Sequence, residues 1–168
     1  MLVVGQAPAA DGWLRTGKAF IKSNGEMLQT GKNLNKLLRK IGLSLNECAY
    51  TELVKCYRGK NSSGYDKAVL SGCVRGCWPI FERQLGTGDF GLLVLLGRPV
   101  LDAFKKKTKA PLVMGRLSDV ELSDSLRKVL SIYHPVHIYP PSARENLHIF
   151  EELGNDLRTL LTEMDPAG

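Results

Sequence analysis

The first residues of the chain form a short apolar run that ends in a polar turn, Leu2-Val3-Val4-Gly5 followed by Gln6-Ala7-Pro8. This pattern is typical of a buried parallel strand that delivers a polar loop to the carboxyl edge of an α/β sheet. A second loop of this kind, Tyr133-His134-Pro135, follows another apolar run. Because the carboxyl ends of parallel strands meet at one edge, the two loops predict an active site that contains Gln6, Asp11 and His134.

Apolar patterning alternates between strands and helices along the chain. Residues 92–96 are the clearest strand, because they are apolar throughout, as expected for a strand buried on both faces. Further strands are predicted over 2–5, 50–56, 129–133 and, weakly, 111–114, and helices over 33–41, 66–85 with a kink or break near Pro79, 99–107 and 142–163. This predicts an α/β fold in a single domain, residues 1–168: a three-layer sandwich with a mostly parallel, four-stranded central sheet and helices on both faces. The long, poorly periodic stretch 6–31 is expected to be a functional loop.

The net charge of +6 is concentrated in the first two-thirds of the chain. Residues 1–109 hold 18 Lys and Arg against 8 Asp and Glu, whereas the remainder is acidic. A basic face of this kind fits a phosphate backbone, and an ordinary solvated surface has the same composition. Neither a membrane-spanning apolar run nor a secretory leader is recognisable, so we expect a cytoplasmic protein that does not bind membranes.

Four cysteines, Cys48, Cys56, Cys73 and Cys77, lie in the middle of the chain. In the absence of a secretion signal, thiols or metal ligands are expected rather than disulfides. The spacing of Cys73 and Cys77 places both on one helical face, where a metal could use them, and buried thiols are the simpler interpretation.

Three ordered blocks of the sequence resemble the uracil-DNA glycosylase superfamily, in particular its iron-sulfur and broad-specificity branches. They are GQAPAADGWLRTGKAF (5–20), TELVKCYRGKN (51–61) and YHPVHIYPPS (133–142), and LLVLLG (92–97) matches the central strand of the family. The resemblance spans nearly the whole chain. It implies an enzyme of base-excision repair, a monomer that hydrolyses the N-glycosidic bond of uracil or another deaminated base in single- or double-stranded DNA.

The resemblance also implies catalytic roles. His134 takes the position of the histidine that donates a hydrogen bond to the uracil oxygen where negative charge develops. Gln6 replaces the glutamate that activates the attacking water in the iron-sulfur branch, and a neutral amide orients water without taking its proton. Asp11 is the nearest acid that could do so. Ala7 stands where the best-known branch has an aspartate.

Substrate binding is expected from Gly5, Ala7 and Pro8 of the first turn, and from two further positions. Phe20 corresponds to an aromatic residue that stacks on the flipped base, and a core phenylalanine is an equal alternative. Glu52 replaces the asparagine that reads the uracil edge. An ionised carboxylate only accepts hydrogen bonds, so it would suit a base with an amino group unless the carboxyl is protonated or points elsewhere.

Contacts with the DNA backbone and the minor groove are expected on both sides of the site. The residues are Arg15, Lys18, Arg58, Lys60, His137, Ile138 and Tyr139. Residues 137–141 could equally be a rigid connection to the last helix.

The resemblance maps Cys56 and Cys73 onto two of the four ligands of a 4Fe-4S cluster, whose other ligands precede the first block in that branch. Cys48 and Cys77 could complete the set only if the fold gathers all four thiolates. We therefore expect neither a metal nor a cofactor, with the 4Fe-4S cluster as the alternative. Because Gln6, Ala7 and Glu52 depart from the family pattern, the alternative function is a catalytically weak or inactive nucleic-acid-binding module.

Overall fold

A computed structural model describes residues 1–8, 12–55, 67–136, 142–152, 154 and 156. Its centre is a five-stranded sheet with the order β2-β1-β3-β5-β4. The strands are β1 (Leu2–Gly5), β2 (Ala49–Glu52), β3 (Leu92–Leu96), β4 (Leu117–Leu122) and β5 (Ser125–Ile132). The first three and β5 pair in parallel, and β4 is an antiparallel edge strand. The α/β class with a mostly parallel sheet is confirmed.

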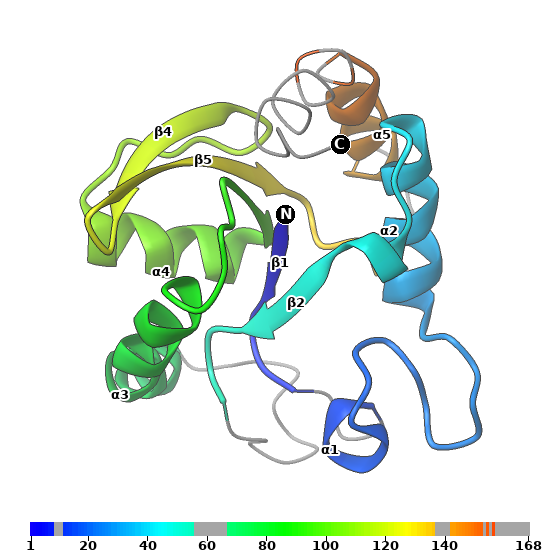
Figure 1. Cartoon of the computed structure of the whole chain (residues 1–168), viewed down its shortest axis with the longest axis horizontal. Helices are drawn as coiled ribbons and strands as arrows, with labels where there is room; N and C mark the ends of the chain where they lie inside the picture. Colours follow the sequence, from blue (N-terminus) through cyan, green and yellow to red (C-terminus); the bar gives the residue numbers. More distant parts are fainter. Residues whose placement is uncertain (9–11, 56–66, 137–141, 153, 155, 157–168) are drawn as a thin grey trace.

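Helices cover both faces of the sheet (Figure 1). One face carries α3 (Lys67–Leu85) and α4 (Arg98–Thr108), and the other carries α2 (Gln29–Lys40) and α5 (Ser142–Glu152). A short α1 (Trp13–Thr16) and a 3-10 turn, η1 (Leu45–Glu47), lie in the connections. None of these helices is both long and apolar enough to cross a membrane.

The sheet separates two hydrophobic cores because successive residues of each strand point to opposite faces. On the α3/α4 face, the rings of Trp78, Phe81 and Phe104 lie within 5.2–5.4 Å of one another. On the α2/α5 face, Leu34 and Phe150 are fully buried against β1, β3 and β5. Each such side chain contributes about 1.5–3 kcal/mol of hydrophobic free energy to folding.

Several strand and helix predictions differ from the structure. The strand expected over 50–56 ends at Glu52, and the weak strand at 111–114 is reduced to one bridge between Met114 and Ser131. The predicted four-stranded sheet gains β4, which forms a hairpin with β5. A kink or break was expected near Pro79; helix α3 continues through it, so the break was wrong, and Trp78 and Phe81 anchor the helix to the core on both sides of the proline.

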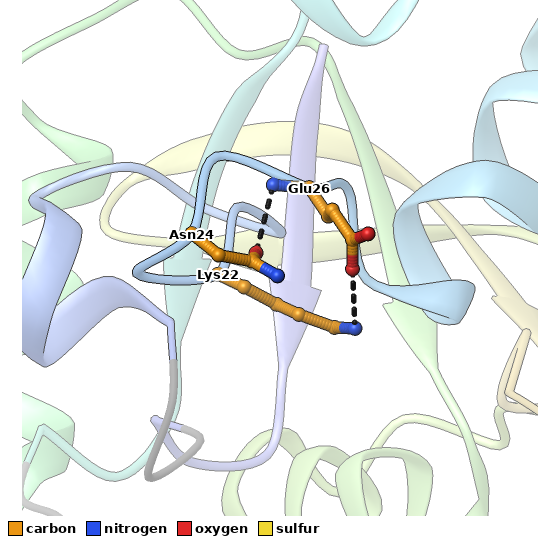
Figure 2. Close-up of polar contacts among 3 residues, drawn as sticks. All are labelled: Lys22, Asn24 and Glu26. Atoms are coloured by element: carbon orange, nitrogen blue, oxygen red, sulfur yellow. Dashed lines mark hydrogen bonds and ion pairs between the residues drawn. The ribbon is translucent and has the colours of Figure 1, made fainter.

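The stretch 6–31 is locally ordered wherever it is described. Ile21 and Met27 form a bridge, and Lys22 N–H donates to the Glu26 carbonyl. Figure 2 shows the side-chain contacts that close this turn: Lys22 Nζ lies 3.0 Å from Glu26 Oε2, and Glu26 N–H donates to Asn24 Oδ1. The turn leads into α2.

Candidate active site

The carboxyl ends of the parallel strands bring the predicted site segments to one edge. Gly5 pairs with Glu52, and the segments that follow β1 and β2 stay paired, since the N–H groups of Leu53 and Val54 donate to the carbonyls of Gly5 and Gln6. At the other end of the site, the Cβ of His134 lies 3.1 Å from the position a Gly97 Cβ would take. Strands β1 and β3 therefore lie between Glu52, at the end of β2, and His134, just after β5. The three strand spacings from β2 to β5 amount to roughly 14 Å.

The first turn is half-buried at Gln6, Ala7 and Pro8, and Ala7 packs on the α3/α4 core. Asp11 lies outside the described residues. The Thr16 hydroxyl organises the chain that follows, because it accepts from Lys18 N–H and lies 3.1 Å from the Gly12 carbonyl. Arg15 in α1 and Lys18 just after it are exposed, as contacts with DNA require.

Phe20 lies beside the site and is also part of the core. Its side chain is 8% exposed, and its backbone is left-handed with φ 62°. The ring packs on Tyr50 with a centroid distance of 4.4 Å, and a Cβ on Gly31 would lie only 2.6 Å from the Phe20 Cβ. The core role is thus visible, and stacking on a base stays a prediction.

Tyr50 belongs to the candidate site and is a residue that sequence reasoning missed. Its ring lies between Trp13, at 5.3 Å, and Phe20, and its hydroxyl donates to Glu52 Oε1. Its position two residues before Glu52 on a strand places both side chains on one face, which is the signal that could have identified it.

Glu52 is a buried residue, with 7% of its surface exposed. Burial raises its pKa to about 7, against opposing effects of the Tyr50 hydrogen bond and the Lys55 charge. Among the described residues, Oε2 has no hydrogen-bond partner. Both Oε2 and the Tyr50 hydroxyl occupy the space that a Cβ on Gly5 would need, so Gly5 is required for this packing.

His134 is held by contacts on both sides. Val136 N–H donates to its Nδ1 at 3.2 Å, so the proton of a neutral ring is on Nε2. Asn33 Nδ2 of α2 donates to the Pro135 carbonyl at 2.6 Å. Asn146 of α5 bridges the backbone of Tyr133, accepting from its N–H and donating to its carbonyl, each at 2.8 Å. Two helices therefore fix the loop that carries the imidazole.

Replacement of Asn146 by alanine is expected to lower the free energy of unfolding by about 1–3 kcal/mol, because it leaves both Tyr133 backbone groups unsatisfied. Urea unfolding measures this change. Asn146→Asp keeps the acceptor for Tyr133 N–H but buries a carboxylate with one oxygen facing the Tyr133 carbonyl, so it should lose at least as much stability near neutral pH. An alanine variant as stable as the parent would show that the bridge does not hold the loop.

The cysteines do not assemble into one set of ligands. Cys48 packs on the α2/α5 core, where burial raises its thiol pKa to about 11 and its Sγ donates to the Ser44 carbonyl. Cys73 and Cys77 pack on the α3/α4 core, across the sheet from Cys48. A cluster that uses all four cysteines therefore does not fit this fold, and no group of three metal-binding side chains occurs in the described part of the chain. Cys56 lies outside that part.

The remaining predicted DNA contacts also lie outside the described residues: Arg58, Lys60, His137, Ile138 and Tyr139. Val136, directly before that last segment, is 43% exposed beside His134. An apolar side chain at this position could meet a DNA groove next to the site.

Comparison with known proteins agrees with this arrangement. The model of the Uracil DNA glycosylase superfamily matches residues 1–158. The chain is also 29% identical over 161 residues to the Type-4 uracil-DNA glycosylase of Archaeoglobus fulgidus, covering 92% of this chain and 75% of that protein. The order of blocks, the parallel sheet and the strand-end histidine are thus explained together: the chain belongs to the uracil-DNA glycosylase superfamily.

Proposed function

We propose that the protein is a DNA glycosylase that hydrolyses the N-glycosidic bond of uracil or another deaminated base. The observation that carries the proposal is the setting of His134. Its Nδ1 accepts a backbone hydrogen bond, which leaves Nε2 as the donor of the neutral ring at the carboxyl edge of the sheet. The similar archaeal glycosylase supports the same reaction class.

The chemistry requires stabilisation of the leaving base. Cleavage of the glycosidic bond produces an oxocarbenium-like sugar and an anionic base, and water then adds to the sugar carbon while its proton goes to an acceptor. A fixed N–H donor at the base oxygen stabilises the developing charge without reorganisation during the reaction. We assign that donor to His134 Nε2. Gln6 orients the water, and Asp11 is the candidate proton acceptor.

We assign DNA binding to two basic residues near the first turn, Arg15 and Lys18. Arg15 is exposed in α1 and Lys18 on the turn after it, on the segment that follows the Gly5 loop in the sequence. Their contacts with phosphates would make binding salt-dependent and independent of sequence. Because binding of this kind is also expected of an inactive module, it does not test the glycosylase activity.

The test is base release from labelled oligonucleotides that carry uracil, hypoxanthine or xanthine, in single and double strands. After incubation with excess protein, alkali cleaves each abasic site, and product is measured on a denaturing gel. We expect cleavage of at least one of these substrates. If none is cleaved, the enzymatic proposal fails and the nucleic-acid-binding module replaces it.

A further inference from the structure

One peptide group beside His134 is contacted on both of its sides. The carbonyl of Pro135 and the N–H of Val136 belong to the same planar trans peptide, so they point in opposite directions. On one side, Asn33 Nδ2 of α2 donates to the carbonyl at 2.6 Å. On the other side, the N–H donates to His134 Nδ1 at 3.2 Å. The amide of Asn33 and the imidazole are therefore linked through a single peptide plane.

The proline leaves this peptide with one soft torsion. The pyrrolidine ring fixes φ of Pro135, so ψ of Pro135 decides where the carbonyl and the following N–H point. The hydrogen bond from Val136 N–H to the imidazole is exposed, and its length is at the upper end of the ordinary range, so water competes for both groups. The hydrogen bond from Asn33 to the carbonyl restrains ψ, and it also polarises the peptide so that the N–H is a stronger donor.

The side chain of Asn33 is itself held in place. Gln29 Nε2, one helical turn earlier on α2, donates to Asn33 Oδ1 at 2.8 Å. Because Oδ1 is engaged as an acceptor, Nδ2 is the atom that faces the Pro135 carbonyl. The neighbouring Leu34 and Leu38 are fully buried, so the helix that carries this amide is anchored in the α2/α5 core.

We propose that Asn33 is a positioning residue, which keeps the Val136 N–H on His134 Nδ1 and so keeps the proton of the neutral ring on Nε2. This inference rests on the proposed function, in which Nε2–H donates to the leaving base. Without the Asn33 amide, the peptide rotates more freely about ψ of Pro135 and Nδ1 loses its donor. The hydrogen bond at one ring nitrogen sets which nitrogen is protonated, so both neutral tautomers then become populated. Only one of them presents an N–H at the reacting base.

The first measurement reads the imidazole and not the activity. Two-bond 15N–1H correlation spectra show which ring nitrogen carries the proton, and they are recorded at about pH 8, where an ordinary imidazole is neutral. The chain has three histidines, and the spectrum of His134→Ala identifies the signals of His134. We expect the parent to hold the Nε2–H tautomer and Asn33→Ala to show a mixture of the two.

The second measurement separates the chemical step from binding. Single-turnover kinetics uses the base that the parent releases, and fluorescence anisotropy gives Kd for a labelled duplex with its 2′-fluoro analogue, in which the fluorine slows cleavage. We expect Asn33→Ala to excise about tenfold more slowly with a Kd within about twofold of the parent, the effect of losing one hydrogen bond in the reaction alone.

A second variant covers the case in which Asn33→Ala does not fold. Asn33→Asp keeps the shape of the side chain and the acceptor for Gln29, but it has no N–H for the Pro135 carbonyl and places a negative charge beside it. Its excision rate should fall at least as far as that of the alanine variant, and its imidazole should show the same mixture of tautomers.

Asn35→Ala is the matched control on the same helix. Asn35 is half-buried like Asn33, and its Oδ1 accepts from the backbone N–H of Leu45 at 3.1 Å. That contact is in η1, just before β2 begins, at the opposite edge of the sheet from His134. The variant therefore loses one hydrogen bond between α2 and a backbone group without affecting the Pro135 carbonyl. Its tautomer and excision rate should equal those of the parent, and circular dichroism establishes that each variant is folded.

Where the parent excises a base, the inference is overturned if Asn33→Ala keeps the parental tautomer or the parental rate, or if Asn35→Ala slows excision equally. Such results leave the proposed glycosylase activity intact. If the parent excises no base and Asn33→Ala still alters the tautomer, the proposed activity fails and the coupling of Asn33 to the imidazole stands.

Discussion

Replacing His134 with alanine is expected to reduce the rate of base excision by about 10²–10³-fold, the usual effect of removing one donor to a developing anion. The loop should remain in place, because Asn33 and Asn146 hold the backbone of Pro135 and Tyr133 rather than the imidazole. Single-turnover kinetics on a uracil-containing duplex measures the chemical step. Fluorescence anisotropy with a labelled duplex that carries one 2′-fluoro-2′-deoxyuridine, which is cleaved slowly, measures binding; binding should change much less than the rate.

The matched control for His134 is His148→Ala. His148 is exposed on α5, and its Nε2 lies 3.0 Å from Glu152 Oε1 at the surface, so its loss should leave excision unchanged. If His134→Ala excises uracil at the parent rate, His134 has no part in the reaction. An equal loss in both histidine variants would instead indicate a general effect on folding.

Replacing Glu52 with glutamine is expected to change how the free energy of unfolding depends on pH. Burial raises the folded-state pKa of Glu52 to about 7 from a reference value of 4.5. The folded state therefore binds the proton more tightly than the unfolded state. The resulting stabilisation is complete below the unfolded-state pKa and is lost as the pH rises through the folded-state pKa.

The difference between these two pKa values corresponds to about 3 kcal/mol. The unfolding free energy of Glu52→Gln relative to the parent should therefore rise by up to about 3 kcal/mol between pH 4 and pH 8. Urea unfolding across this range measures the change. A constant difference between the two proteins would show that Glu52 has an ordinary pKa in the folded state.

Glu47→Gln is a control of opposite sign. Glu47 closes a capping box at η1, where its carboxylate accepts from Ser44, and these hydrogen bonds lower its pKa. Its contribution to stability is present above the reference pKa and is lost as the pH falls. Removing this carboxylate should thus lower the free energy of unfolding at neutral pH and change it little at low pH. The opposite pH dependence at Glu52 would then be due to its burial and not to a property shared by all carboxyl groups.

The parallel strands could be predicted because burial on both faces demands a continuous apolar run, as at Leu92–Leu96. The edge strand β4 could not. Only Val120 and Leu122 of β4 are buried, and its polar residues resemble a loop. The turn to β5 is formed by Ser123 and Asp124 with φ 51° and 61°, without the glycine that usually marks a two-residue hairpin.

The same distinction applies within the site. His134 and Gly5 could be proposed as candidate site residues from sequence because Gly5 ends an apolar strand and His134 lies two residues after another. Tyr50 could not be recognised as a partner of Glu52, since that requires knowing where β2 ends and which face each residue takes. Asn33 contacts Pro135, 102 residues away, and Asn146 contacts Tyr133, 13 residues away. Both asparagines lie on helices whose position is set by packing.

The sequence by itself determined the fold class, the edge of the sheet that carries the candidate site, and the superfamily, because strand periodicity and ordered motifs are local properties of the chain. Only the tertiary structure decided the chemical state of the side chains at that edge. It buries Glu52 against Gly5, leaves one carboxyl oxygen without a described partner, and separates Cys48 from Cys73 by the sheet. Burial and pairing depend on distant segments meeting, and they set the protonation and ligand geometry that composition leaves open.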